Sequence, residues 1–228
     1  YLSKRMELPE KERFHYSILE KGYEGEVKFD QLTENLQEER IIMNDLLFEV
    51  KNSYFQIDTL IISQGVIHLL DIKNFEGDYY IESDKVFAVK TRRECKNPII
   101  QLKRSDTLFR ILLQNLKQNY LVEAFVIFIN PEFTLYQAQM NQPIILPTQV
   151  NRFLRELSET RSTLNDGHKK LAQKLISLHQ NKNPFTMLPG FNYGDLQKGI
   201  YCKSCGSFLT YKMNYDLVCG KCGESERM

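Results

Sequence analysis

The sequence predicts an α/β (α+β) fold in which strands and helices alternate along one main domain, followed by a small C-terminal module. Two apolar runs, 54–62 and 66–73, are rich in β-branched and aromatic residues and are joined by a short turn at Gly65, as in a β-hairpin. A later segment, 99–119, has helical periodicity instead. Four of the five cysteines cluster near the C-terminal end, which predicts the separate module.

The overall composition excludes few functions. Because 30 Lys and Arg balance 29 Asp and Glu in 228 residues, the net charge gives no electrostatic footprint for nucleic acid, although a local patch would suffice for binding. The longest apolar stretches are too short to span a bilayer, and no signal-peptide pattern opens the sequence. We therefore expect a soluble, cytoplasmic protein that makes no membrane contact.

The N-terminal part is expected to be helical. Residues 1–21 are highly charged and predict a helix or arm that packs on the main domain through Ile18 and Leu19. Gly22 and Gly25 then predict a break before a second helix, whose apolar positions are Phe29, Leu32 and Leu36. Glu26 precedes this apolar stripe by one turn, so its carboxylate is expected to face inward.

The centre of the chain is expected to form the sheet. Asn97 followed by Pro98 is a helix-entry signal, and 122–129 is the apolar run of a central buried strand. The elements expected around these two features are strands at 41–50, 79–81 and 86–89 and helices at 150–157 and 166–180.

A shift in composition at Asn181 marks the end of the main domain, because breaker residues become frequent there. The predicted organisation has five parts: an arm or helix at 1–21, a core at 22–130, a helical extension of the core at 131–180, a linker at 181–198 and the cysteine module at 199–228.

The cysteine module contains two matching CxxC-Gly motifs. Two thiolates spaced in this way on a tight turn can coordinate one side of a tetrahedral ion, and a second such turn completes a closed four-sulfur site. The sequence therefore predicts a structural zinc site in a zinc ribbon, with the ligands Cys202, Cys205, Cys219 and Cys222. Two functions stay open for it, because it would serve equally as a purely structural ribbon or as a docking module for nucleic acid or protein.

The hairpin carries the second candidate site. Asp71 and Lys73 alternate onto one face of a strand, and Asp58 lies on its partner. Glu26 and Gln101, which begins a helix, could converge on the same sheet edge. Two carboxylates make an oxygen site suited to magnesium or manganese. Taken alone, Asp71 and Lys73 favour a charged pair at a sheet edge, with Asp58 as an incidental acid near a turn.

The order of these motifs is more specific than any one of them. Gly22-x-x-Gly25-Glu26, Gln56-Ile-Asp58, Asp71-Ile-Lys73-Asn74 and Gln101 follow one another over roughly residues 20–120. In this respect the chain resembles the nuclease-related domain family, NERD, of the PD-(D/E)xK nuclease superfamily. Asp71 stands where the family more often has Glu.

The resemblance implies a restriction-endonuclease-like mixed sheet flanked by helices and a metal-dependent phosphodiesterase site. It implies that Asp58 and Asp71 are ligands of a catalytic Mg or Mn ion and that Lys73 is the catalytic lysine. Glu26 would be the helix-borne acid and Gln101 an auxiliary polar residue. Members of the family often carry zinc ribbons as well, which fits the cysteine module.

Basic residues surround Gln101 in the sequence and could bind phosphate groups or simply be solvated. The candidates for nucleic-acid binding are Arg92, Arg93, Lys96, Lys103 and Arg104. His68 alternates away from Asp71 and Lys73, so we expect a core histidine.

The sequence thus predicts a metal-dependent nuclease that hydrolyses phosphodiester bonds in DNA, and possibly in RNA, in nucleic-acid processing or repair. The alternative is a non-catalytic module that binds nucleic acid or protein through the zinc ribbon.

Overall fold

The computed structural model describes residues 2–36, 39–184, 189–213 and 216–227, so residues 185–188 of the predicted linker lie outside the described residues. The chain forms two compact units. The smaller consists of residues 1–16 together with 187–228, and the larger of residues 17–186. Each unit is described by itself below.

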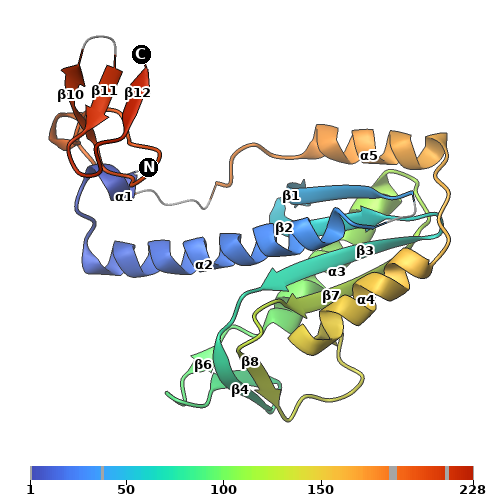
Figure 1. Cartoon of the computed structure of the whole chain (residues 1–228). Helices are drawn as coiled ribbons and strands as arrows, with labels where there is room; N and C mark the ends of the chain where they lie inside the picture. Colours follow the sequence, from blue (N-terminus) through green and yellow to red (C-terminus); the bar gives the residue numbers. More distant parts are fainter. Residues whose placement is uncertain (1, 37–38, 185–188, 214–215, 228) are drawn as a thin grey trace. The chain divides into compact units, whose positions relative to one another are not determined.

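The larger unit is built on a five-stranded sheet with the order β1-β2-β3-β7-β9. Its first three strands pair antiparallel, whereas β3, β7 and β9 pair parallel. The sheet is therefore mixed and flanked by helices, as predicted (Figure 1). The strands are β1 (Ile41–Val50), β2 (Ser53–Ile62), β3 (Val66–Lys73), β7 (Leu121–Phe128) and β9 (Ile144–Ile145).

Helices cover both faces of this sheet, because side chains alternate along its strands. On one face, Leu60 and Leu69 pack with α3 (Pro98–Asn115) and α5 (Asp166–Leu178). On the other, Ile61 and Leu70 pack with Phe29 of α2 (Glu10–Thr33) and with α4 (Pro147–Glu159). The parallel crossover from β3 to β7 runs through α3, whose N-cap Asn97 accepts a hydrogen bond from the Ile99 amide at 2.9 Å. The helix-entry signal in the sequence is confirmed.

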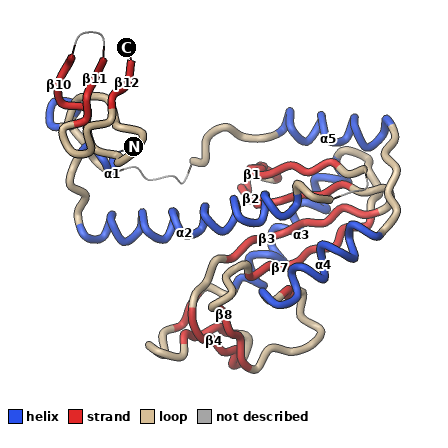
Figure 2. The backbone as a smooth tube through the Cα atoms, in the orientation of Figure 1, coloured by secondary structure: helices blue, strands red, loops and turns tan. Residues whose placement is uncertain are grey.

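A second sheet with the order β6-β5-β4-β8 extends from the end of β3 (Figure 2). It lies against the main sheet through aromatic rings, of which Phe128 and Phe133 stack with centroids 3.9 Å apart. The predicted helical extension over 131–180 contains α4 and α5, but β8 and β9 also lie there and pair with β4 and β7. The strands of this sheet are β4 (Gly77–Glu82), β5 (Lys85–Ala88), β6 (Glu94–Cys95) and β8 (Phe133–Tyr136).

The predicted break at Gly22 is wrong, because α2 runs without interruption from Glu10 to Thr33. Gly25 has a packing role in this helix. A Cβ atom there would lie 2.6 Å from the Cβ of Asn74, which follows β3. Glycine lets α2 approach the end of β3 closely, and the Asn74 amide then donates to the Lys21 carbonyl at 2.8 Å.

Ile18 and Leu19 do not anchor an arm on the main domain, since they are 52% and 58% exposed.

The smaller unit joins the two ends of the chain. Arg5 of α1 (Leu2–Arg5) donates from its guanidinium to the carbonyls of Gln197 and Gly199 at 2.8 and 2.9 Å. The same guanidinium lies over the rings of Tyr201 and Phe208, 4.9 and 5.3 Å from their centroids. The remaining elements are η1 (Tyr193–Asp195), β10 (Leu209–Met213), β11 (Asp216–Cys219) and β12 (Ser225–Arg227).

Among the described residues, no helix combines the length and the apolar character that crossing a membrane requires.

Candidate functional site

The site lies where β2 and β3 separate. Their pairing runs from Ile62 opposite Ile67 to Thr59 opposite Leu70, which brings Asp58 and Asp71 next in register. Beyond this point β2 continues along β1, and β3 continues along β7 to Lys73. Residues that face each other across an antiparallel pair project to the same face. The two carboxylates therefore sit in a fork between diverging strands.

Direct contacts connect three of the five predicted residues, and Asp58 is bound to the backbone beside them. The ammonium of Lys73 lies 2.7 Å from Oδ2 of Asp71, which confirms that these two side chains share one face. The side-chain amide of Gln101, in the first turn of α3, donates to Oδ1 of Asp71 at 3.1 Å. Oδ2 of Asp58 accepts from the backbone N–H of Ile72 at 2.7 Å. Because the hydrogen-bonded pairing of β2 with β3 ends before this point, the Ile72 amide of β3 is available to the Asp58 carboxylate of β2.

Glu26 lies at the rim of this group. It is half-buried on α2, directly after the Gly25 contact with Asn74. Burial raises the pKa of its carboxyl group, with further contributions from Asp45 and an opposing one from Lys73. Glu26 therefore shares the electrostatic field of the site, whereas the described contacts connect Asp71 with Lys73 and Gln101 and hold Asp58 on the Ile72 amide.

The two aspartates are costly to ionise. Burial, followed by the charge of Asp71, raises the pKa of Asp58 to about 7. Burial also raises the pKa of Asp71, although the adjacent Lys73 ammonium opposes this shift. Perturbed acids gathered in this way are typical of functional sites.

The donor set fits a hard divalent cation. The buried Asp71 and the half-buried Asp58, with the half-buried Glu26 nearby, share one ammonium group, that of Lys73. A divalent ion would supply the missing positive charge, and Mg²⁺ commonly binds through one or two protein carboxylates while keeping water ligands. Asp58 and Asp71 are the residues that would hold it.

The charge of Asp58 predicts a pH-dependent stability. Between pH 4 and 7 the folded protein retains a proton that the unfolded chain has lost, so without divalent ions the free energy of unfolding should fall as the pH rises through this window. Asp58→Asn should weaken this dependence, to which the raised pKa values of Asp71 and Glu26 also contribute, and stabilise the protein by on the order of 2–4 kcal/mol at pH 8. Denaturant unfolding in chelator at pH 5 and pH 8 measures both effects.

The exposed Asp78 provides the control. Asp78→Asn should leave the pH dependence unchanged. Magnesium should stabilise the wild type more at pH 8 than at pH 5, because the ion and the proton compete for the same carboxylate oxygens. Equal stabilisation by magnesium in wild type and Asp58→Asn would contradict the assignment of Asp58 as a ligand.

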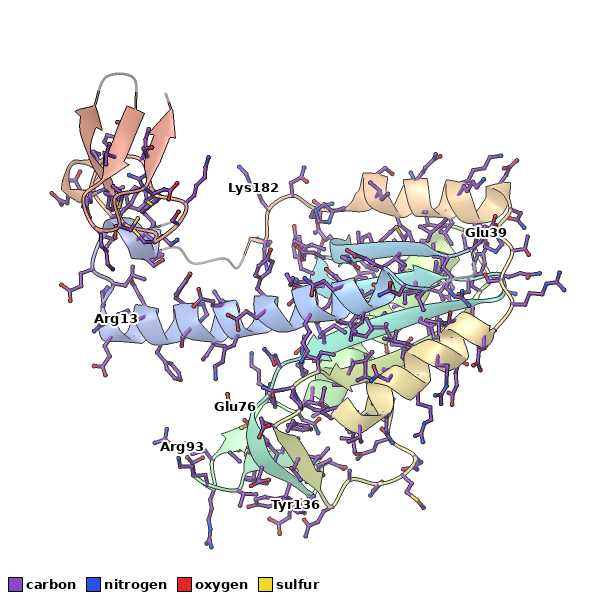
Figure 3. The ribbon with its side chains drawn as sticks, viewed as in Figure 1. Arg13, Glu39, Glu76, Arg93, Tyr136 and Lys182 are labelled. Carbon is purple, nitrogen blue, oxygen red and sulfur yellow. The ribbon has the colours of Figure 1, made fainter. Side chains whose placement is uncertain are left out.

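The five predicted basic residues separate into two groups. Lys96 and Arg104 line a pocket at the start of α3, and Gln101 is part of the same wall. Arg92 and Arg93 are exposed on the small sheet, where Figure 3 shows Arg93 beside β6. Lys103 is exposed on α3 and lies outside the pocket lining.

This pocket was not predicted from the sequence. Its remaining wall includes Tyr54, Gln56 and Ile100. Tyr54 and Gln56 precede Asp58 on β2, so the alternation along this strand could have predicted that they lie on the same face as Asp58. The place of Ile100 in the pocket could not be predicted, because an isolated apolar residue in a helical pattern is ordinarily assigned to the core.

His68 is buried, and its Nε2 atom lies 3.4 Å from Oε2 of Glu123. It packs edge-on against Phe153, on the α4 face of the sheet, which confirms a core histidine.

The four clustered cysteines form a candidate metal centre. Their sulfur atoms all lie within 4.8 Å of one another, close to the roughly 3.8 Å that tetrahedral zinc–sulfur bonds of 2.3 Å require. In the part of the chain that the structure describes, this is the group of three or more His, Cys, Asp or Glu side chains that could hold a metal ion. The prediction that these residues could form a zinc site is confirmed.

The two CxxC turns have the same backbone hydrogen bonds. The amides of Gly206 and Gly223 donate to the carbonyls of Cys202 and Cys219, each at 2.9 Å. Both glycines have positive φ angles, 68° and 76°, which favour a residue without Cβ. The glycine after each motif is therefore required by the turn.

Comparison with known proteins agrees with this geometry. The model of the nuclease-related domain family matches residues 21–129, a segment that holds all five residues of the carboxylate site. No curated protein and no solved structure matches the chain significantly. The resemblance carried by the ordered motifs is confirmed, since residues 21–129 of this chain match the nuclease-related domain family, NERD.

Proposed function

We propose that this domain is a metal-dependent nuclease that hydrolyses phosphodiester bonds in DNA, with RNA as a further substrate. The observation that carries the proposal is the strand fork, where the buried Asp71 and the half-buried Asp58 lie beside one lysine, Lys73. A merely structural ion pair would not need Asp58, whose burial and proximity to Asp71 raise its pKa to about 7. Retaining such a costly group is expected where a cation binds.

Each residue has a role that its position supports. Asp58 and Asp71 would hold Mg²⁺ or Mn²⁺. A bound divalent ion supplies a water of lowered pKa and neutralises charge on the phosphate. The Lys73 ammonium, held 2.7 Å from Asp71, is placed to orient the attacking water and to stabilise negative charge on the phosphorane oxygens. Gln101 acts as a positioning residue, because its amide fixes Oδ1 of Asp71.

Glu26 would contribute negative charge from α2 and bind a water ligand of the ion. Its half-buried side chain and its electrostatic interaction with Asp71 and Lys73 support this role.

The cysteine centre is proposed to hold a structural zinc ion. A cytoplasmic location is proposed with it, because clustered reduced cysteines are typical of reducing compartments. DNA is the proposed partner of the larger unit, in processing or repair.

The test is cleavage of single- and double-stranded DNA and RNA by the purified chain with magnesium, with manganese and with chelator. Cleavage should require the ion and should be lost in Asp71→Ala, since that variant removes one of the two ligands. A matched control is Asp106→Ala, because Asp106 forms a partly exposed ion pair with Arg110 on α3. Tight binding without cleavage under every condition would instead identify a non-catalytic nucleic-acid-binding protein.

A further inference from the structure

A pocket adjoins the carboxylate site on the α3 side. It has a volume of about 550 Å³, within the range of roughly 300–1,000 Å³ that is usual for small-molecule sites. Residues from β2 and from the start of α3 form most of its wall. The lining includes Tyr54, Gln56, Lys96, Ile100, Gln101 and Arg104.

The charge of the pocket is positive. Lys96 and Arg104 both line it, and no Asp or Glu is among the described lining residues. No ion pair connects either cation with an acid in the described parts of the chain. The guanidinium of Arg104 is held in place by donating to the Tyr54 carbonyl at 2.9 Å. Such an uncompensated pair of cations favours an anionic ligand.

The pocket also offers apolar surface. Ile100 is 63% exposed although it is a large aliphatic residue, and the half-buried Tyr54 supplies an aromatic ring on the neighbouring strand. Cationic groups beside such surfaces match a nucleotide, whose phosphate is charged and whose base has flat apolar faces.

Gln101 connects the pocket with the acids. Its side chain lines the pocket, and its amide donates to Oδ1 of Asp71 at 3.1 Å. A ligand in the pocket is therefore separated from the Asp71 carboxylate by a single side chain. A strand that places one phosphate at Lys73 would place a neighbouring nucleotide at Lys96 and Arg104.

We propose that this pocket binds one nucleotide of a single nucleic-acid strand, next to the phosphate at the carboxylate site. The inference rests on the proposed nuclease function and narrows its substrate class. The volume admits one unpaired nucleotide, whereas a base pair embedded in a duplex would not fit. The substrate is thus a strand that is single-stranded, or locally unpaired, at the point of contact.

The test is fluorescence anisotropy with a labelled fifteen-nucleotide oligodeoxythymidine in chelator, so that binding is measured apart from cleavage. Arg104→Ala should weaken binding roughly tenfold and lower the slope of log affinity against log salt by about one, because one phosphate contact is lost. Lys174→Ala removes the same charge from an exposed position on α5, outside the pocket lining, and should change affinity by less than about twofold.

A second pair of variants tests the pocket without removing a cation. Ile100→Glu should weaken binding at least roughly tenfold, because it brings a negative charge to the phosphate. Its fold should be preserved, since Ile100 is exposed and an acid in the first turn suits the helix N-terminus. Ile176→Glu, at a 58% exposed position on α5, should have no effect.

Equal binding by Ile100→Glu, Ile176→Glu and wild type would overturn the proposal, even if cleavage were observed. A duplex of the same length that binds as tightly as the single strand, with the same loss in Ile100→Glu, would overturn the restriction to unpaired nucleotides. Pocket-dependent binding without any metal-dependent cleavage would support the pocket and contradict the nuclease function, so the two proposals fail in distinguishable ways.

Discussion

Replacing Lys73 with methionine is expected to lower the rate of metal-dependent cleavage roughly 10²–10⁴-fold. The Lys73 ammonium lies in direct contact with Asp71, at 2.7 Å, and methionine keeps a similar side-chain length without the charge. The loss should appear in kcat rather than in substrate affinity, because Lys73 acts on charge that develops during the reaction. Single-turnover cleavage with magnesium measures the effect.

Lys21→Met is the matched control, because Lys21 also pairs with an acid, Glu76, at 2.9 Å. That pair is exposed on both sides, and surface pairs of this kind contribute little. Cleavage by Lys21→Met should therefore match the wild type. A Lys73→Met variant that cleaves at the wild-type rate would show that the lysine is only the structural partner of Asp71.

Removal of zinc is expected to unfold the smaller unit and to leave the larger one folded. Structural zinc sites contribute about 10–16 kcal/mol to folding in small metal-binding domains, and the buried side chains around Cys202 and Cys219 form only a small cluster. The larger unit has its own two core clusters and needs no metal for folding. Limited trypsin digestion with and without chelator, followed by mass spectrometry, separates the two units.

Cys202→Ser should have the same effect as chelation, whereas Cys95→Ser is the control, since Cys95 lies apart from the cluster on β6. Cleavage after Arg5 should appear only when the metal is lost, because its guanidinium is otherwise bound to the carbonyls of Gln197 and Gly199. Zinc content of about one ion per wild-type chain completes the measurement. The same digestion pattern with and without chelator would contradict a structural role for the metal.

Local patterns predicted the elements that hold the site. The alternation of Asp71 and Lys73, the short turn at Gly65 and the Asn97 cap each depend on neighbours in sequence, and all three are present in the structure. The cysteine spacing is equally local, and the four sulfur atoms lie together.

Contacts between distant residues could not be predicted in this way. Gly22 and Gly25 signalled a break, but the close packing of α2 on Asn74 keeps one helix and makes a small residue necessary at Gly25. The pairing of β8 with β4 likewise depends on a partner more than fifty residues away, so the region after 130 read as helical. The contact of Arg5 with Gln197 leaves no periodic pattern at all.

The discontinuous smaller unit also sets an order of events during synthesis. Residues 1–16 leave the ribosome before residues 17–186, but their partners in 187–228 are made after both. Residues 17–186 can therefore fold around their own cores before residues 187–228, the partners of residues 1–16, have been made. Only when Cys222 has emerged can the four sulfurs capture an ion and the Arg5 side chain find its carbonyls. Metal capture would thus follow the folding of residues 17–186, and a chain that has bound an ion at the four cysteines would be one that has been translated beyond Cys222.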